Sequence, residues 1–255
     1  MTPAPIHLAS ERLLLDPVGA AYWPAEELLV LSDLHLEKGS SFARKGMLLP
    51  PWDTHATLER LAHLLRRWQP RTVVALGDSF HDATGAARLG STEANRLRAV
   101  TAAVRFVWVQ GNHDPEPPTG LGGEWLETFA TGPFTFRHQA HLKSEPGEIC
   151  GHHHPKAAVP ARGGQVSRPC FITDGQRLML PAFGAYAGGL DVRDSAIARL
   201  FPHGGRVFLL GQDRLFSFSL RGGKPAPSSA EPPRQGSPKP AAPPPSPASS
   251  GRNPD

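Results

Sequence analysis

The first half of the chain alternates between continuous apolar runs and apolar residues at helical spacing. The continuous runs, which are typical of buried strands, are 28–31, 72–76 and 104–109. Apolar residues three and four positions apart predict a helix over about 54–68, capped by Asp53 or Thr54, and a second helix over about 92–103. This order of strands and helices with short turns predicts a partly parallel α/β sheet.

The flanking segments predict further strands and one long loop. Residues 6–31 form a β-hairpin or meander. Residues 36–52 are basic and punctuated by glycine, and they form either an ordinary solvated loop or a phosphate-contacting lip. The second half is mostly β, with short strands expected at about 125–129, 133–138, 147–151, 165–172, 177–183, 206–211 and 214–220. Together these elements predict a four-layer α/β/β/α sandwich of two mixed sheets, in one domain over 1–221.

Polar side chains follow four of the predicted strands at the point where each strand ends. These strand ends are Ser32-Asp33-Leu34-His35, Gly77-Asp78, Gly111-Asn112-His113-Asp114 and Gly151-His152-His153-His154. In α/β folds the carboxyl ends of the strands are where sites form, so we expect these side chains to meet. Carboxylate, amide and imidazole donors together predict a site for two divalent metal ions.

The chemistry of the donors suggests how two ions would share them. Asp78 is the natural bridge, because a carboxylate can give one oxygen to each ion. Asp33 and His35 lie two residues apart, so on extended backbone their side chains point to the same face and suit one ion. Asn112 and two further histidines would complete the second ion.

The histidines after residue 120 supply the remaining ligands. They are His138, His141, His152, His153, His154 and His203. In an extended segment His152 and His154 face one way and His153 the other, which makes the first two the ligand pair and His153 a solvated or packed bystander.

Composition separates the end of the chain from the rest. Residues 222–255 contain 11 prolines and no aromatic residue, Leu, Ile, Val or Met, so we expect a disordered tail. This tail supplies half of the formal net charge of +4, so the basic balance is weak evidence for nucleic acid.

Cys150 and Cys170 lie in apolar surroundings and are expected to be reduced buried thiols. The chain lacks a signal peptide or a long apolar run, which predicts a soluble, cytoplasmic protein.

The order and spacing of the four polar motifs resemble those of the calcineurin-like metallophosphoesterase superfamily. Within it, the chain is similar to the small bacterial ligase-associated DNA damage response endonuclease family. The narrower similarity lies in 32–39, 76–82 and Pro181-Ala182-Phe183-Gly184-Ala185-Tyr186. It spans about residues 6–220 and leaves out the tail.

The resemblance implies a ligand set for two metal ions, with Mn favoured and Fe or Zn as the other choices. The ligands implied for the first ion are Asp33, His35, Asp78 and His154. Those implied for the second are Asp78, Asn112, His152 and an additional histidine. His138, at the end of a predicted strand, fits this additional position better than His141.

The implied reaction is in-line attack on phosphorus by a metal-bridging hydroxide. His113 would contact the phosphoryl oxygens or protonate the leaving group, oriented by Asp114.

Three functions remain open on the sequence. The first is a phosphodiesterase or endonuclease that acts on DNA ends or cyclic nucleotides in DNA repair. The second is a phosphomonoesterase of broad specificity. The third is a mainly recruited subunit of a DNA-repair assembly with a ligase, helicase or exonuclease, which family resemblance suggests and the basic tail could tether. No membrane partner is expected.

Two further residues are candidates for substrate binding. His81 either approaches the substrate or is a loop histidine bonded to backbone. Tyr186 either stacks on a base or ribose or lies in an ordinary buried or interface position.

Overall fold

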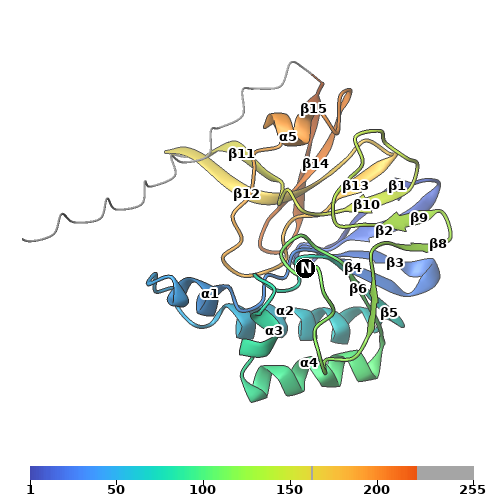
Figure 1. Cartoon of the computed structure of the whole chain (residues 1–255). Helices are drawn as coiled ribbons and strands as arrows, with labels where there is room; N and C mark the ends of the chain where they lie inside the picture. The colour runs from blue at the N-terminus through green and yellow to red at the C-terminus, as the bar shows by residue number, and fades with distance from the viewer. Residues whose placement is uncertain (162, 223–255) are drawn as a thin grey trace, which may run out of the picture.

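The computed structural model describes residues 1–161 and 163–222, which form two facing β-sheets (Figure 1). The first sheet has the strand order β1-β2-β3-β4-β5-β6-β7. Its strands are β1 (Ala4–Leu8), β2 (Glu11–Leu15), β3 (Ala21–Trp23), β4 (Leu28–Leu31), β5 (Thr72–Leu76), β6 (Arg105–Val109) and β7 (Glu124–Leu126). The first four pair antiparallel and the last four parallel, which confirms both the meander and the partly parallel sheet.

Two amphipathic helices connect the parallel strands and cover the outer face of the first sheet (Figure 1). They are α2 (Asp53–Trp68) and α4 (Ser91–Ala103). Leu58, Leu61 and Leu64 of α2 are buried against β4 and β5, as their helical spacing predicts. The structure differs at the start of α2, where no side chain caps the helix and Asp53 is its first residue.

The second sheet has the order β15-β14-β12-β13-β10-β9-β8, with β11 paired to β12. Its strands are β8 (Phe129–Thr131), β9 (Phe134–Phe136), β10 (Glu148–Cys150), β11 (Lys156–Ala161), β12 (Gly164–Thr173), β13 (Arg177–Met179), β14 (Gly204–Leu210) and β15 (Leu215–Arg221). Within it β9, β10 and β13 run parallel, and the other pairs are antiparallel. The sheet is therefore mixed, as predicted.

Three hydrophobic layers hold the sandwich together. The central layer lies between the sheets, where Val30 and Val107 of the first meet Phe136 and Phe171 of the second. The second layer lies under α2 and α4, and the third packs the short helix α5 (Ser195–Ala198) against the outer face of the second sheet. The α/β/β/α order is confirmed, although one turn of helix makes the fourth layer thin.

The segment 36–52 is not wholly a loop, because it contains helix α1 (Lys38–Arg44). Its sequence, rich in glycine and serine, has little helix propensity. Tertiary contacts hold the helix instead: the Asp53 carboxylate accepts the Gly39 N–H at 2.9 Å, and Thr54 Oγ1 accepts the Glu37 N–H at 2.9 Å.

The other differences also come from long-range packing. The single strand expected at 125–129 is two strands, β7 and β8, which belong to different sheets. The short elements β11, the helix α3 (Gly85–Arg88), the 3-10 helix η1 (Pro24–Glu26) and α5 were not predicted. The helical elements are too short for a periodic pattern to emerge from the sequence, and β11 contains Pro160, which argues against a strand.

The remaining expectations about the chain are met only in part. Cys150 and Cys170 are both buried and free, as predicted. Among the described helices, none has the length and apolar content needed to cross a membrane. The tail at 222–255 lies, except for Gly222, outside the described residues, so the domain boundary stays a prediction. The cytoplasmic location also stays a prediction.

Phe171→Ala should lower the free energy of unfolding by about 3–5 kcal/mol, because it opens a cavity between the sheets around a fully buried ring. Urea denaturation measures this change. Phe216→Ala is the matched control, since the Phe216 ring is 49% exposed and its loss should cost less than about 1 kcal/mol. Equal losses in the two variants would contradict the assignment of the core.

Candidate metal centre

The polar strand ends of both sheets meet at one edge of the sandwich. The loops after β4, β5 and β6 bring three motifs from the first sheet, and the loops after β9 and β10 bring the histidines of the second. The side chains that come together here are Asp33, His35, Asp78, Asn112, His138, His152 and His154. The structure thus places every predicted metal ligand in one site.

One group of donors consists of Asp33, His35 and His154. The Nε2 atoms of His35 and His154 lie 3.1 Å apart, and His154 Nε2 lies 3.2 Å from Asp33 Oδ1. Asp33 Oδ1 is buried and accepts no hydrogen bond from any of the described residues. Two imidazole nitrogens and an unsatisfied carboxylate oxygen that face one point form a donor set that fits a divalent cation.

A second group consists of Asp78, His138 and His152, with Asn112 beside it. His138 Nε2 lies 2.9 Å from Asn112 Oδ1, 3.1 Å from His152 Nδ1 and 3.4 Å from Asp78 Oδ1. Four donors from four strand ends again converge on one point. Their mixed nitrogen and oxygen character suits Mn, Fe or Zn.

Asp78 lies between the two groups. Its Oδ1 faces His138, and its Oδ2 lies 3.9 Å from His35 Nε2. The backbone N–H of His113 donates to Oδ1 at 2.9 Å and fixes the carboxylate. One oxygen toward each group is the arrangement that a bridging carboxylate requires.

A hydrogen bond to the backbone fixes the orientation of the His138 ring. Its Nδ1–H donates to the Leu76 carbonyl at 2.8 Å, which leaves Nε2 directed at the donor group. Burial lowers the pKa of His138, but the hydrogen bond to Asp78 and the charge of Asp33 outweigh burial and raise this pKa to about 9. For His35 burial dominates and lowers the pKa to about 3. Asp33 keeps a pKa below its usual value despite its burial, because the neighbouring imidazoles of His154, His138 and His35 favour its charged form.

The backbone of the ligand segments is not extended, which corrects one prediction. Asp33, His35, Asp78, His152 and His154 have φ values of 53°, 44°, 46°, 70° and 47°. The side-chain directions therefore come from left-handed turns after the strands. His35 still joins Asp33, and His154 and His152 lie in different groups, as the implied ligand sets divide them. His153 packs its ring against His152 at 4.7 Å and stays outside both groups, as expected for a bystander.

Three glycines allow the strand ends to approach this closely. A Cβ on Gly111 would overlap the backbone nitrogen of Asp78, and one on Gly151 would overlap the Ser32 hydroxyl. A Cβ on Gly77 would come within 2.7 Å of the His138 ring. Atoms of neighbouring strand ends therefore occupy the space that any side chain at these positions would need.

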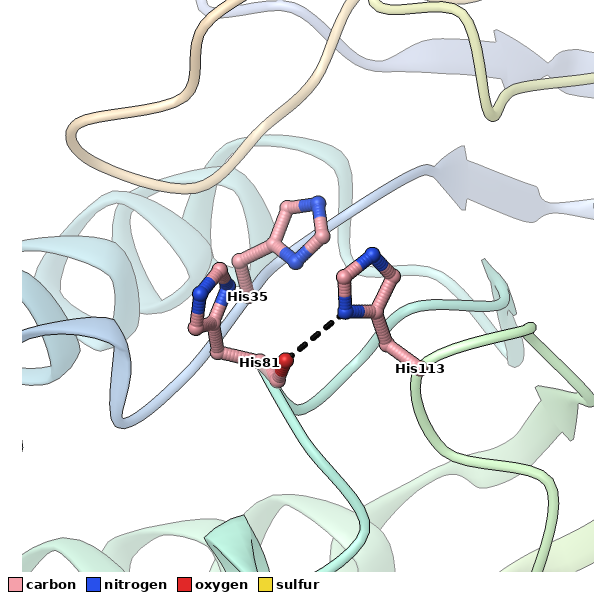
Figure 2. Close-up of side chains that lie close together, drawn as sticks. All are labelled: His35, His81 and His113. Atoms are coloured by element: carbon pink, nitrogen blue, oxygen red, sulfur yellow. Dashed lines mark hydrogen bonds between the residues drawn. The ribbon is translucent and has the colours of Figure 1, made fainter. Parts of the chain in front are cut away.

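His113 lies at the open side of the site, 41% exposed, with its Nε2 3.8 Å from Asp78 Oδ2. Its Nδ1–H donates to the His81 carbonyl at 2.8 Å (Figure 2). Asp114, which was expected to orient His113, instead accepts the Phe80 N–H at 3.0 Å through Oδ2. Burial raises the pKa of Asp114 to about 7. The orienting partner is thus a backbone carbonyl, and Asp114 supports the turn after β5.

His81 is held by the backbone of a neighbouring loop, and its ring lies beside His113, so its approach to a substrate stays a prediction. Its backbone N–H donates to Leu36 O at 2.9 Å, and its ring stacks on His113 at 5.5 Å and meets the edge of His35 (Figure 2). Burial, followed by the charge of Lys38, lowers the pKa of His81 to about 4. A neutral imidazole therefore lines the open side of the site.

Tyr186 lies at the rim, with its side chain 44% exposed and its carbonyl 2.9 Å from Lys38 Nζ. Gly184, two residues earlier, donates its N–H to the Asp33 carbonyl at 3.0 Å and so holds this rim against the site.

His141, the alternative to His138, is 61% exposed and lies 3.9 Å from Glu145 Oε1. It does not reach either donor group.

Two supporting residues were missed in the sequence. Ser32 donates its hydroxyl to Asp33 Oδ2 at 2.5 Å, and only its position before Asp33 hints at this role. Arg88 holds Asp82 through two hydrogen bonds of 2.7 and 2.8 Å and also donates to Ser40 Oγ at 2.9 Å. No local signal identifies Arg88, because its partners lie up to 51 residues away.

Comparisons with known proteins place the chain in a family. Residues 27–174 match the model of the calcineurin-like phosphoesterases. The chain is similar to Pseudomonas putida nuclease MPE, whose crystal structure it matches at 28% identity and a TM-score of 0.68, over 84% of this chain and 100% of that chain. It also matches Yfce, a phosphoesterase from E. coli, at 15% identity and a TM-score of 0.39, over 76% of this chain and 99% of that chain. No curated protein matches the sequence.

Gly111→Ala should displace Asp78 and lower both metal content and activity by more than about tenfold, because the added methyl group overlaps the Asp78 backbone. Metal analysis of the purified protein and a phosphoester assay measure the two effects. Gly188→Ala is the matched control, since a Cβ there meets no atom within 4 Å. Full metal loading of Gly111→Ala would contradict the packing of these strand ends.

Proposed function

Because the chain belongs to the calcineurin-like phosphoesterase family, we propose that it is a nuclease that hydrolyses phosphodiester bonds with two divalent metal ions. The observation that carries the proposal is the position of Asp78, with one carboxylate oxygen toward each donor group. That the protein is a metal-dependent phosphoesterase follows from the family match and the two His/Asp groups. Its nuclease activity is the further step, supported by the match to nuclease MPE.

The donor groups divide into two ligand sets. We assign Asp33, His35, Asp78 and His154 to the first ion. We assign Asp78, Asn112, His138 and His152 to the second. Bound ions would supply positive charge to the phosphoryl group and lower the pKa of a coordinated water. Manganese is the proposed metal, and Fe and Zn suit the same donors.

The chain's own residues then position the substrate and handle a proton. His113, partly exposed and fixed through Nδ1 by the His81 carbonyl, turns Nε2 toward the space beside Asp78. In its protonated form this nitrogen would donate to a phosphoryl oxygen or to the leaving oxygen. Tyr186 at the rim is the proposed contact for a base or ribose. Asp114 acts through the turn that carries Phe80.

The setting of the reaction is a further part of the proposal. Similarity of the motifs to the ligase-associated DNA damage response endonucleases supports a role in DNA repair, in an assembly with a ligase, helicase or exonuclease. A phosphomonoesterase would use the same metal groups, so the substrate test must separate the two ester types.

With added manganese, the protein should hydrolyse bis-p-nitrophenyl phosphate faster than p-nitrophenyl phosphate. Asp78→Ala should reduce this diester hydrolysis by more than about 100-fold, because one carboxylate serves both donor groups. Asp213→Ala, at an exposed position in the turn between β14 and β15, is the control and should keep full activity. Faster monoester hydrolysis would identify a phosphatase instead, and loss of activity only in the control would contradict the site.

His113→Ala should lower kcat by about 100-fold while the metal content stays near two ions, because the side chain serves proton transfer and not metal binding. Steady-state kinetics and metal analysis of the same sample measure both. His63→Ala, an exposed histidine on α2, is the matched control. Loss of metal from His113→Ala would show that its role is structural.

A further inference from the structure

A hollow of about 500 Å³ opens next to the metal centre, on the side of His81 and His113. Its lining residues are Ser41, Arg44, Lys45, His81, Asp82, Ala83, Thr84 and His113. His113 lines this hollow, and its Nε2 lies 3.8 Å from Oδ2 of Asp78, the carboxylate between the donor groups, so the hollow directly adjoins the metal centre. A molecule with its phosphorus at the metal centre would extend into this hollow on that side.

The hollow carries positive charge that is available to a ligand. Arg44 and Lys45 are both exposed at the end of α1, and within residues 1–161 and 163–222 no carboxylate pairs with either. The one acidic residue in the lining, Asp82, is already held by Arg88 in a two-fold hydrogen bond. That hydrogen bond holds the pKa of Asp82 well below its usual value. The positive charges of Arg44 and Lys45 are thus not neutralised by a carboxylate of the described residues.

The wall that carries these cations is fixed before a ligand binds. Arg88 donates to Ser40 Oγ at 2.9 Å and to Asp82, which ties α1 to the segment after β5. Arg44 Nη1 donates to Thr84 Oγ1 at 3.2 Å across the same hollow. A positioned guanidinium loses less conformational freedom when it binds a phosphate than a free one does.

We propose that this hollow binds a second phosphate, the one next to the scissile phosphodiester in a nucleic-acid strand, through Arg44 and Lys45. The inference rests on the proposed function and narrows its substrate class. Guanidinium and ammonium groups are the usual partners of backbone phosphates, and such contacts fix the register of a strand without reading its sequence. A cyclic mononucleotide has no second phosphate to place in the hollow, so strands are the preferred substrates.

The test compares Arg44→Gln/Lys45→Gln with the wild-type protein on short single-stranded oligonucleotides and on bis-p-nitrophenyl phosphate, both with manganese. The KM for the oligonucleotide should rise about tenfold, because charge-assisted hydrogen bonds to phosphate are lost. The slope of log KM against log salt concentration should decrease by about 0.7 for each phosphate contact that is removed. Hydrolysis of bis-p-nitrophenyl phosphate should change less than about twofold, because this diester has no second phosphate to bind.

A chemical change in the substrate gives an independent reading of the same contact. A neutral methylphosphonate in place of the neighbouring phosphate should raise the wild-type KM by the same factor, and the double variant should show no further rise. Arg44→Lys/Lys45→Arg should restore most of the affinity, because it keeps both charges. Arg66→Gln/Arg71→Gln, which removes the same charge from exposed positions on and after α2, should leave KM unchanged.

Three results would overturn the proposal, and they are distinguishable. An unchanged oligonucleotide KM in Arg44→Gln/Lys45→Gln would exclude the second phosphate contact while leaving the nuclease activity intact. Equal losses on the oligonucleotide and on bis-p-nitrophenyl phosphate would place the effect in the metal centre. Cleavage of bis-p-nitrophenyl phosphate without cleavage of any oligonucleotide by the wild-type protein would refute the proposed nuclease function itself.

Discussion

The structure depends on the close approach of backbone turns from two sheets at one edge of the sandwich. Gly77, Gly111 and Gly151 each stand where a Cβ would strike a residue of a neighbouring strand end. Asp33 ties the sheets together directly, because its Oδ2 accepts the backbone N–H of His152 at 3.1 Å. The His138 ring does the same in the other direction through the Leu76 carbonyl. The sheets are thus joined at this edge by the residues that carry the chemistry.

This close approach has an energetic cost that a bound cation would offset. Asp33 and Asp78 are buried with several imidazoles, and the left-handed backbone of the ligand residues costs about 1–2 kcal/mol each. Among the described residues nothing satisfies Asp33 Oδ1 by hydrogen bonding. Strained backbone and unsatisfied buried oxygen together are typical of a functional site. We expect the protein to be most stable with metal bound, since binding to the folded state alone shifts the folding equilibrium.

The sequence predicts the sandwich and the set of donors well, because both are encoded locally. Each apolar run ends at a glycine or at polar residues, and the carboxyl ends of parallel strands must share an edge. The conformation of the donor turns is not encoded in this way. Extended backbone was the expectation for Asp33 and His35, but both residues have left-handed φ values, which no local pattern in the sequence indicates. The partner of Asp114 could not be predicted either, because Phe80 belongs to another strand end.

Helix α1 shows how a segment with little structure of its own can set substrate preference. Nothing in the run of glycine and serine predicts a helix, and Asp53, Thr54 and Arg88 supply the contacts that hold it. These same contacts fix where Arg44 and Lys45 stand relative to His113. The donors of the metal centre would hold ions that contact the phosphoryl group, which every phosphoester carries. Selection among phosphoesters must therefore come from a neighbouring surface. The end of α1 is such a surface, because it carries the positive charges of Arg44 and Lys45 and is held in place by packing.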